Sequence, residues 1–298
     1  MSVLHLTACP VCSGTQIRYV LTGKDHSVSQ QSFEVWECRN CTHRFTQNIP
    51  DPSAIGAYYQ FEAYVSHTDS KKGLVNQLYH WVRRWTLQLK ARQVIAWTQR
   101  KTGKALDVGA GTGDFLATLR HKGWQVQGLE PDANARQLAQ AKHGLTLESP
   151  ERLFDLPAQS FDLISLWHVL EHVHQLADYT AAFERLLKPD GVLVLALPNY
   201  TSADARHYAH DWAAWDLPRH LHHFSPLSVQ NALSRAGFRL QSTAPMWFDA
   251  FYVSLLSEQH RHSKLALFLG FFRGMQSNLA AFFNRERCSS LVYVFVKK

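Results

Sequence analysis

The sequence lacks any apolar run long enough to cross a membrane. Its longest such run, LALFLGFF at residues 265–272, is far shorter than the roughly 18–20 residues of a spanning helix. The opening residues, MSVLHLTACPVC, have neither the basic region nor the long apolar region of a secretory signal. We therefore expect a soluble, cytoplasmic chain. With 298 residues, 46% of them hydrophobic, it can form one large α/β domain and a small additional module.

Cysteine is also scarce, and its placement is informative. Of the five cysteines, four form two C-x-x-C pairs, Cys9 with Cys12 and Cys38 with Cys41, separated by 25 residues. Two such pairs supply the four thiolates of a tetrahedral zinc site. Disulfides fit poorly in a chain without a secretion signal. The sequence predicts a zinc ribbon over residues 1–47, with strands at TQIRYVLTG and SFEVWEC. Because four protein ligands leave no open position, we expect structural zinc.

Acidic residues are absent from residues 71–104, which contain nine lysines and arginines. Apolar residues there recur at helical spacing and predict an amphipathic cap helix, or two, within a connecting region at 48–104. This basic face is either simply solvated or a surface for an anionic partner such as RNA, a nucleotide-sugar or a phospholipid headgroup. The tyrosine-rich end of residues 48–67 either folds back over an active site or packs against the main domain.

The glycine loop in ALDVGAGTGDFL, residues 105–116, lacks the third glycine of the dinucleotide-binding G-x-G-x-x-G pattern. Asp107 precedes its first glycine, and a carboxylate there suits an ammonium group better than a pyrophosphate. Strands and helices alternate after the loop, which predicts a doubly wound, mostly parallel sheet. Ligands of such sheets bind at the carboxyl ends of the strands. Glu130 ends the second strand.

Four segments in this order resemble the class I S-adenosylmethionine-dependent methyltransferases: LDVGAGTGDFL, GLEPD, FDLISLWHVLEHV and LLKPDGVLVLALPN. The resemblance covers residues 100–245 and the final strand, SSLVYVFVKK. It implies a Rossmann-like sheet of seven strands with helices on both faces and an antiparallel last strand, over residues 105–298. It also implies S-adenosylmethionine as cofactor. The cofactor-binding residues that it implies are Asp107, Gly109, Ala110, Gly111, Glu130, Pro131, Trp167 and His168. For the adenine contact only Glu151 offers a weak match.

Methyl transfer to a hydroxyl or a carbon acid benefits from a general base, and histidine is the usual residue near neutral pH. The loop WDLPRHLHHFSP, residues 215–226, follows the fifth strand, where the family places substrate loops. We predict His220 as the base, with His168 and His222 as further candidates. For Glu171 and His172 we expect structural hydrogen bonds rather than chemistry.

An apolar insertion at about 247–287 separates the sixth strand from the last. It predicts two helices broken near residues 270–274, which form either a lid or an extension of the core. An apolar lid would suit an acceptor with an apolar portion, or a transient membrane-surface contact.

Three groups of methyltransferases share parts of this architecture. Sugar C-methyltransferases carry a zinc ribbon and a His-rich loop, quinone O-methyltransferases share the LEHV motif, and some ribosomal RNA methyltransferases carry a ribbon. We expect O- or C-methylation of a small-molecule, sugar or lipid-like acceptor. The alternatives are a ribosomal RNA methyltransferase and a non-catalytic binder of S-adenosylmethionine. Nucleic acid is the less favoured partner, because residues 9–41 have balanced charge.

Overall fold

The computed structural model describes residues 3–59 and 74–298, with side chains from residue 85 onward in the second stretch. The tyrosine-rich stretch, expected either to cover the active site or to pack against the main domain, lies largely outside these residues, at 60–67. Among the described residues, no helix is both long enough and apolar enough to cross a membrane.

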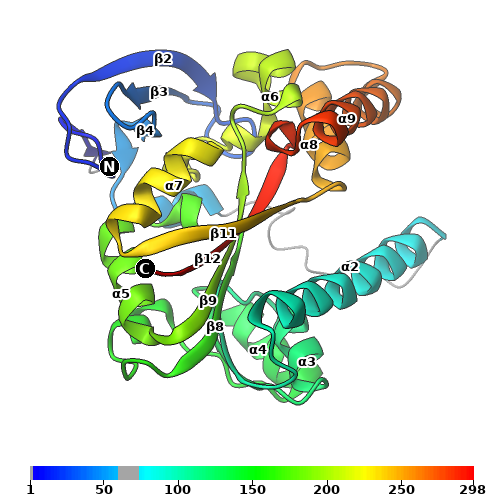
Figure 1. The fold of residues 1–298 in the computed structure, drawn as a ribbon. Coiled ribbons are helices and arrows are strands. Elements are labelled where there is room, and N and C mark those ends of the chain that lie inside the picture. Colours follow the sequence, from blue (N-terminus) through cyan, green and yellow to red (C-terminus); the bar gives the residue numbers. More distant parts are fainter. Residues whose placement is uncertain (1–2, 60–73) are drawn as a thin grey trace.

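A mixed sheet of six strands forms the centre of the molecule, in the order β11-β12-β9-β8-β6-β7 (Figure 1). Strands β6, β7, β8 and β9 run parallel, and β12 lies antiparallel between β9 and β11. The α/β class and the antiparallel last strand are therefore confirmed. The elements of this region, in chain order, are α2 (Leu74–Thr98), β6 (Lys104–Val108), α3 (Asp114–Arg120), β7 (Gln125–Leu129), α4 (Ala133–His143), β8 (Phe161–Trp167), α5 (Leu176–Leu186), β9 (Leu187–Pro198), α7 (Pro226–Arg235), β11 (Phe238–Pro245) and β12 (Ser290–Lys297).

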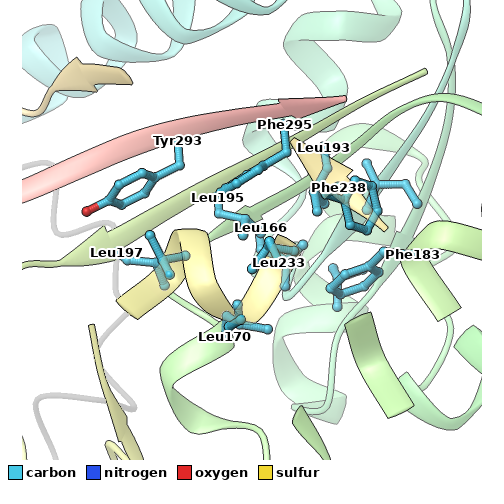
Figure 2. Packing of buried hydrophobic residues seen from close by; sticks show 14 of the residues in the cluster. Leu166, Leu170, Phe183, Leu193, Leu195, Leu197, Leu233, Phe238, Tyr293 and Phe295 are labelled. Carbon is cyan, nitrogen blue, oxygen red and sulfur yellow. The ribbon is translucent and has the colours of Figure 1, made fainter. Parts of the chain in front are cut away.

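Helices cover both faces of the sheet because alternate side chains of each strand point to opposite faces. One set of strand residues, which includes Leu166, Leu193 and Leu195, packs with Phe183 of α5 and Leu233 of α7 (Figure 2). The opposite set packs against α2 and α3. The amphipathic helix expected from the sequence is thus a single helix, α2, which packs on the sheet through residues from Leu87 onward.

The expected seventh strand is missing. Residues 145–149 make one parallel bridge, between Glu148 and Leu129, and Glu148 N donates to Gly128 O at 3.0 Å. Pro150 then begins the 3-10 helix η2 (Pro150–Phe154). Because proline has no N–H and fixes its backbone, it ends the pairing before a strand is established.

The N-terminal module, which we define as residues 3–50, contains β1 (Val3–Leu4), β2 (Ile17–Lys24), β3 (Ser32–Cys38), β4 (Arg44–Gln47) and β5 (Ile49–Pro50). The strands expected at residues 15–23 and 32–38 are confirmed as β2 and β3. A feature the sequence did not predict is β10 (His222–His223), which comes from the loop after β9 and pairs antiparallel with β4. The sheet order is β10-β4-β3-β2, so the module and the loop share one sheet.

Between β9 and α7 lie short helical segments, α6 (Ala203–Tyr208), η4 (Ala209–Asp211) and η5 (Ala213–Trp215). The insertion between β11 and β12 is a pair of helices, α8 (Asp249–His260) and α9 (Ala266–Phe283), followed by η6 (Arg285–Arg287). The remaining 3-10 segments are η1 (Ile55–Tyr59) and η3 (Leu170–His172).

Two helices were expected in the insertion, but the predicted break is wrong. Gly270 and Gly274 lie inside α9, and the chain turns between residues 261 and 265. A Cβ added to Gly270 would lie 2.7 Å from the Cα of Leu255, and one added to Gly274 would lie 2.8 Å from the Cα of Phe251. These glycines therefore allow α9 to approach α8 closely rather than end the helix.

Candidate active site and cysteine cluster

The glycine loop joins β6 to α3 at the carboxyl edge of the sheet. Gly109 has φ +74°, and a Cβ there would lie 2.3 Å from Cγ2 of Val169. Gly111 has φ +54°, and a Cβ there would meet nothing within 4 Å. The N–H groups of Gly109 and Ala110 both donate to Leu129 O at the end of β7, at 2.8 and 2.9 Å. The loop is thus held against β7 while its Gly111 side stays open.

Asp107 is buried beneath this loop, 2% exposed. Its Oδ1 accepts a hydrogen bond from Ser165 Oγ at 2.6 Å. Burial raises the pKa of Asp107 to about 7, against the opposing effects of Ser165 and of the half-buried Lys90. A cation bound beside this carboxyl would favour its ionised form.

Glu130 closes the other side of the loop. Its Oε2 accepts from Gly111 N at 2.7 Å, and its Oε1 accepts from Asp132 N at 3.0 Å. These two backbone donors fix the carboxylate at the end of β7, with Pro131 exposed just beyond it. Asp107, Gly109, Ala110, Gly111 and Glu130 therefore converge on one edge, as expected. Glu151 is exposed in η2, and no contact of this residue tests its predicted role.

Trp167 and His168 follow at the end of β8, the strand next to β6. The ammonium of Lys90 lies 4.0 Å from the centre of the Trp167 ring. His168 has φ +57°, and it places Nε2 3.1 Å from Asp249 Oδ2 and Nδ1 3.4 Å from Glu171 Oε1. Burial alone would lower the pKa of His168, but the two carboxylates raise it to about 10. An imidazolium has no lone pair to accept a proton, so these carboxylates favour His168 as a cation rather than as a base.

His220 lies beside η3, which directly follows β8. Its Nδ1 donates to Ala214 O at 2.9 Å, which leaves the lone pair on Nε2 if this hydrogen bond sets the tautomer. Its ring centre is 4.6 Å from that of His172, in an edge-to-face arrangement. Nδ1 of His172 lies 3.0 Å from both Arg219 O and Tyr59 Oη. Burial and the neighbouring His220 lower the pKa of His172 to about 4, so it is neutral.

Glu171 completes this group. One carboxylate oxygen of Glu171 and one ring nitrogen each of His172 and His220 lie within 4.8 Å of one another. Glu171 is 1% exposed, and among the described side chains neither of its oxygens has a hydrogen-bond partner. The contact with His168 Nδ1 at 3.4 Å is an ion pair. Burial raises the pKa of Glu171, but His168 and the other two histidines lower it overall, so the group is a carboxylate.

Sequence reasoning assigned Glu171 and His172 to structural hydrogen bonds and thereby missed their meeting with His220. The signal that was available is their position immediately after β8, whose carboxyl end faces the glycine loop.

His222, a further candidate for the base, does not join this group. It is 3% exposed, its Nε2 bonds to Val173 O at 3.0 Å, and its Nδ1 lies 3.1 Å from Nε2 of His43. Several effects act on the pKa of His222, and burial, the largest of them, lowers it to about 4. Both ring nitrogens of a neutral imidazole are therefore engaged, and His222 fastens the loop to the N-terminal module. His223 acts similarly, with Nε2 3.0 Å from Thr46 Oγ1.

The four paired cysteines meet at one end of the N-terminal module, and their Sγ atoms lie within 4.8 Å of one another. The Sγ atoms of Cys9 and Cys41, and those of Cys12 and Cys38, are 3.5 Å apart. These separations are too long for disulfides, and the cysteines are free. They are close to the edge of about 3.8 Å that follows from four sulfurs placed tetrahedrally at 2.3 Å from zinc. The donor set and the spacing fit a closed tetrahedral site.

Known proteins that are similar to this chain in sequence or in fold include methyltransferases. Ubiquinone biosynthesis O-methyltransferases of Nitrosococcus oceani and Xanthomonas oryzae are each 29% identical to this chain over 160 residues. The aligned region is 49% of this chain and 67% and 66% of those relatives, so the chain spans about two thirds of their length. A solved SAM-dependent methyltransferase from Archaeoglobus fulgidus superposes with a TM-score of 0.49 at 19% identity, over 72% of this chain and 94% of that one.

A family model described as "Methyltransferase domain" matches residues 78–243. The matched residues are more than half of the chain's 298. They include the glycine loop, Asp107, Glu130 and the group around Glu171. The chain belongs to the methyltransferase domain family.

Proposed function

We propose that this enzyme transfers a methyl group from S-adenosylmethionine to an oxygen or carbon atom of a small-molecule acceptor. The observation that carries the proposal is the meeting of Glu171, His172 and His220 after β8. We assign the cofactor to residues at the carboxyl ends of β6 and β7, on the same edge of the sheet. The relatives named as ubiquinone biosynthesis O-methyltransferases support a small-molecule acceptor.

The residues present fit this cofactor. Burial raises the pKa of Asp107 to about 7. The ammonium of the methionine part would stabilise the ionised form of this carboxyl. Gly111 presents an open backbone face, and Glu130 presents a fixed carboxylate for the ribose hydroxyls. Trp167 and His168 would border the methionine part. When bound, S-adenosylmethionine supplies an electrophilic methyl group on a sulfonium.

The chain's own part is to position the acceptor and manage its proton. We assign Nε2 of His220 as the atom that accepts the proton. The carboxylate of Glu171 then stabilises the imidazolium, because an opposite charge within a few ångströms favours the charged form. His168 and Lys90 are cations beside the same edge, and they stabilise negative charge that develops on the acceptor.

We also assign Cys9, Cys12, Cys38 and Cys41 as the ligands of one structural zinc. The four sulfurs leave no position for an acceptor, so the metal would stabilise the N-terminal module and, through β4 and β10, the loop that carries His220.

Labelled S-adenosylmethionine tests the proposal. The purified protein is incubated with the methyl-labelled cofactor and separate fractions of small metabolites, lipids and ribosomal RNA. We expect label in a small-molecule or lipid fraction. Label in ribosomal RNA would replace this proposal by an RNA methyltransferase. Binding of S-adenosylhomocysteine with no transfer to any fraction would favour a non-catalytic binder.

A further inference from the structure

The inner face of the helical pair α8 and α9 is buried against the rest of the protein. Four small residues of α9 are buried along that face: Gly270, Gly274, Ser277 and Ala281. Ser277 Oγ donates to Asp204 Oδ1 at 2.8 Å. Arg261, in the turn between the helices, pairs with Asp211 at 2.9 Å. The pair is thus held firmly against α6 and its neighbours, in one orientation (Figure 1).

The outer face of α9 is apolar and exposed. Eight large apolar side chains of this helix are each at least 40% exposed, and Phe283 reaches 81%. They are Leu267, Phe268, Phe271, Phe272, Met275, Leu279, Phe282 and Phe283. A contiguous exposed apolar patch of this kind marks an interaction site, whereas scattered single residues do not.

Further exposed apolar side chains lie at the start of α8 and on α2. Trp247, Phe248 and Tyr252 are exposed at the start of α8. The ring of Trp85, exposed on α2, lies 5.9 Å edge-to-face from the ring of Phe248. The apolar surface therefore adjoins the helix that belongs to the nine-cation stretch at residues 71–104.

The charges around this surface are almost all positive. Residues 261–287 contain five lysines and arginines and one acidic residue, Glu286. Lys264 precedes α9, while Arg285 and Arg287 follow it, and all three are exposed. An apolar helix face flanked by cations is the arrangement that lies in a bilayer interface and attracts anionic headgroups. A second copy of this chain would instead oppose cations to cations across a symmetric contact.

We propose that the outer face of α9, with the adjoining residues of α8 and α2, docks on the surface of an anionic lipid bilayer. The helix lies flat, with its aromatic and aliphatic side chains among the acyl chains and its flanking cations at the headgroups. Docking does not depend on the proposed methyl transfer. It would nevertheless place the active site near the bilayer, because Asp249, the first residue of α8, bonds to His168.

Vesicle flotation tests the docking with the full-length chain. We expect binding to vesicles of phosphatidylglycerol and phosphatidylcholine, and much weaker binding to phosphatidylcholine alone or at high salt. The triple variant Phe268→Ser, Leu279→Ser, Phe283→Ser should lower the partition coefficient by at least about 100-fold, given the transfer free energies of these side chains. The matched control is Leu227→Ser, which removes an exposed apolar side chain of α7 and should leave partitioning unchanged.

Two further measurements make the outcome decisive. Affinity for S-adenosylhomocysteine, measured by calorimetry, should be equal in the triple variant and the unmodified protein, which shows that the variant is folded. Sedimentation without lipid should show the same oligomeric state for both. The proposal is overturned if neither vesicle binds the protein, if the triple variant binds as well as the unmodified chain, or if the substitutions dissociate a dimer instead.

Discussion

The cysteine cluster lies outside the proposed active site, yet its loss should impair turnover. The change to make is Cys38→Ser, which removes one of four thiolate ligands. Structural zinc contributes roughly 10–16 kcal/mol of apparent binding free energy in small modules, where binding and folding are coupled. Without this contribution, we expect the N-terminal module to lose its fold around β3 and β4.

The module in turn supports the loop that carries His220. The hydrogen bonds that join the module to this loop and to its flanking residues include these five: Thr46 Oγ1 to His220 O at 2.6 Å, Tyr200 Oη to Thr42 O at 2.7 Å, Thr46 N to Leu221 O at 2.9 Å, His43 to His222 at 3.1 Å and Asn231 Nδ2 to Cys41 O at 3.3 Å. At about 1 kcal/mol each, they stabilise the loop by roughly 5 kcal/mol. Their loss should displace His220, and a displacement of about 1 Å can cost about 100-fold in rate.

Three measurements on Cys38→Ser check this reasoning. Metal analysis should find about one zinc per chain in the unmodified protein, purified without chelators, and little in the variant. Turnover should fall by about 100-fold, while affinity for S-adenosylhomocysteine stays within a few-fold. The matched control is Cys288→Ser, a buried cysteine outside the cluster, which should keep its zinc. Full turnover in a zinc-free Cys38→Ser protein would refute the proposed coupling.

Four other outcomes are expected. His220→Ala should lower turnover about 10²–10⁴-fold with cofactor affinity nearly unchanged; unchanged turnover would remove the need for this base. Since the folded pKa of His168 is about 10 and its ordinary value is 6.5, its contribution to stability is complete below pH 6.5 and is lost as the pH rises toward 10. Asp249→Asn should flatten that part of the pH–stability curve. Chemical denaturation at several pH values between 6.5 and 10 measures the slope, and a slope equal to that of the unmodified protein would contradict this expectation. Gly109→Ala should abolish calorimetric binding of S-adenosylhomocysteine, because its Cβ would lie 2.3 Å from Val169 Cγ2. RNA binding, measured by filter retention, should be weak and strongly salt-dependent, with no methyl transfer to ribosomal RNA at physiological salt.

The sequence predicted features that arise from local patterns. The buried parallel strands β6, β7, β8 and β9, the glycine loop and the cysteine pairs can each be recognised within a dozen residues of sequence, and the structure has these features. The prediction of a helix break at Gly270 and Gly274 was wrong because glycine occurs both at turns and at close contacts between helices. Which of the two applies here depends on the position of α8, which the sequence does not show. The seventh strand of the sheet does not form at residues 145–149 for a local reason, because Pro150 stops the pairing of this segment with β7.

The sequence places Glu171 and His172 after β8, but it does not show that His220 joins them, since about fifty residues separate them and no periodicity links a loop to a strand end. The three histidines at 220, 222 and 223 look equivalent in sequence. Their different roles follow from burial and from the partners of each ring nitrogen, which come from His43, from β4, from η5 and from the segment after η3.

The sheet shared by β4 and β10 has a consequence for synthesis. His43 and His222, which meet across it, are 179 residues apart in the chain. At about 5–20 residues per second, roughly ten to forty seconds pass between the emergence of these two partners from the ribosome. During that time β4 is an exposed edge, and Phe45, fully buried in the finished protein, lacks its covering. Unpaired edges of this kind pair with other chains. We therefore expect the protein to be most prone to aggregation during synthesis, after β4 has emerged and before β10 has.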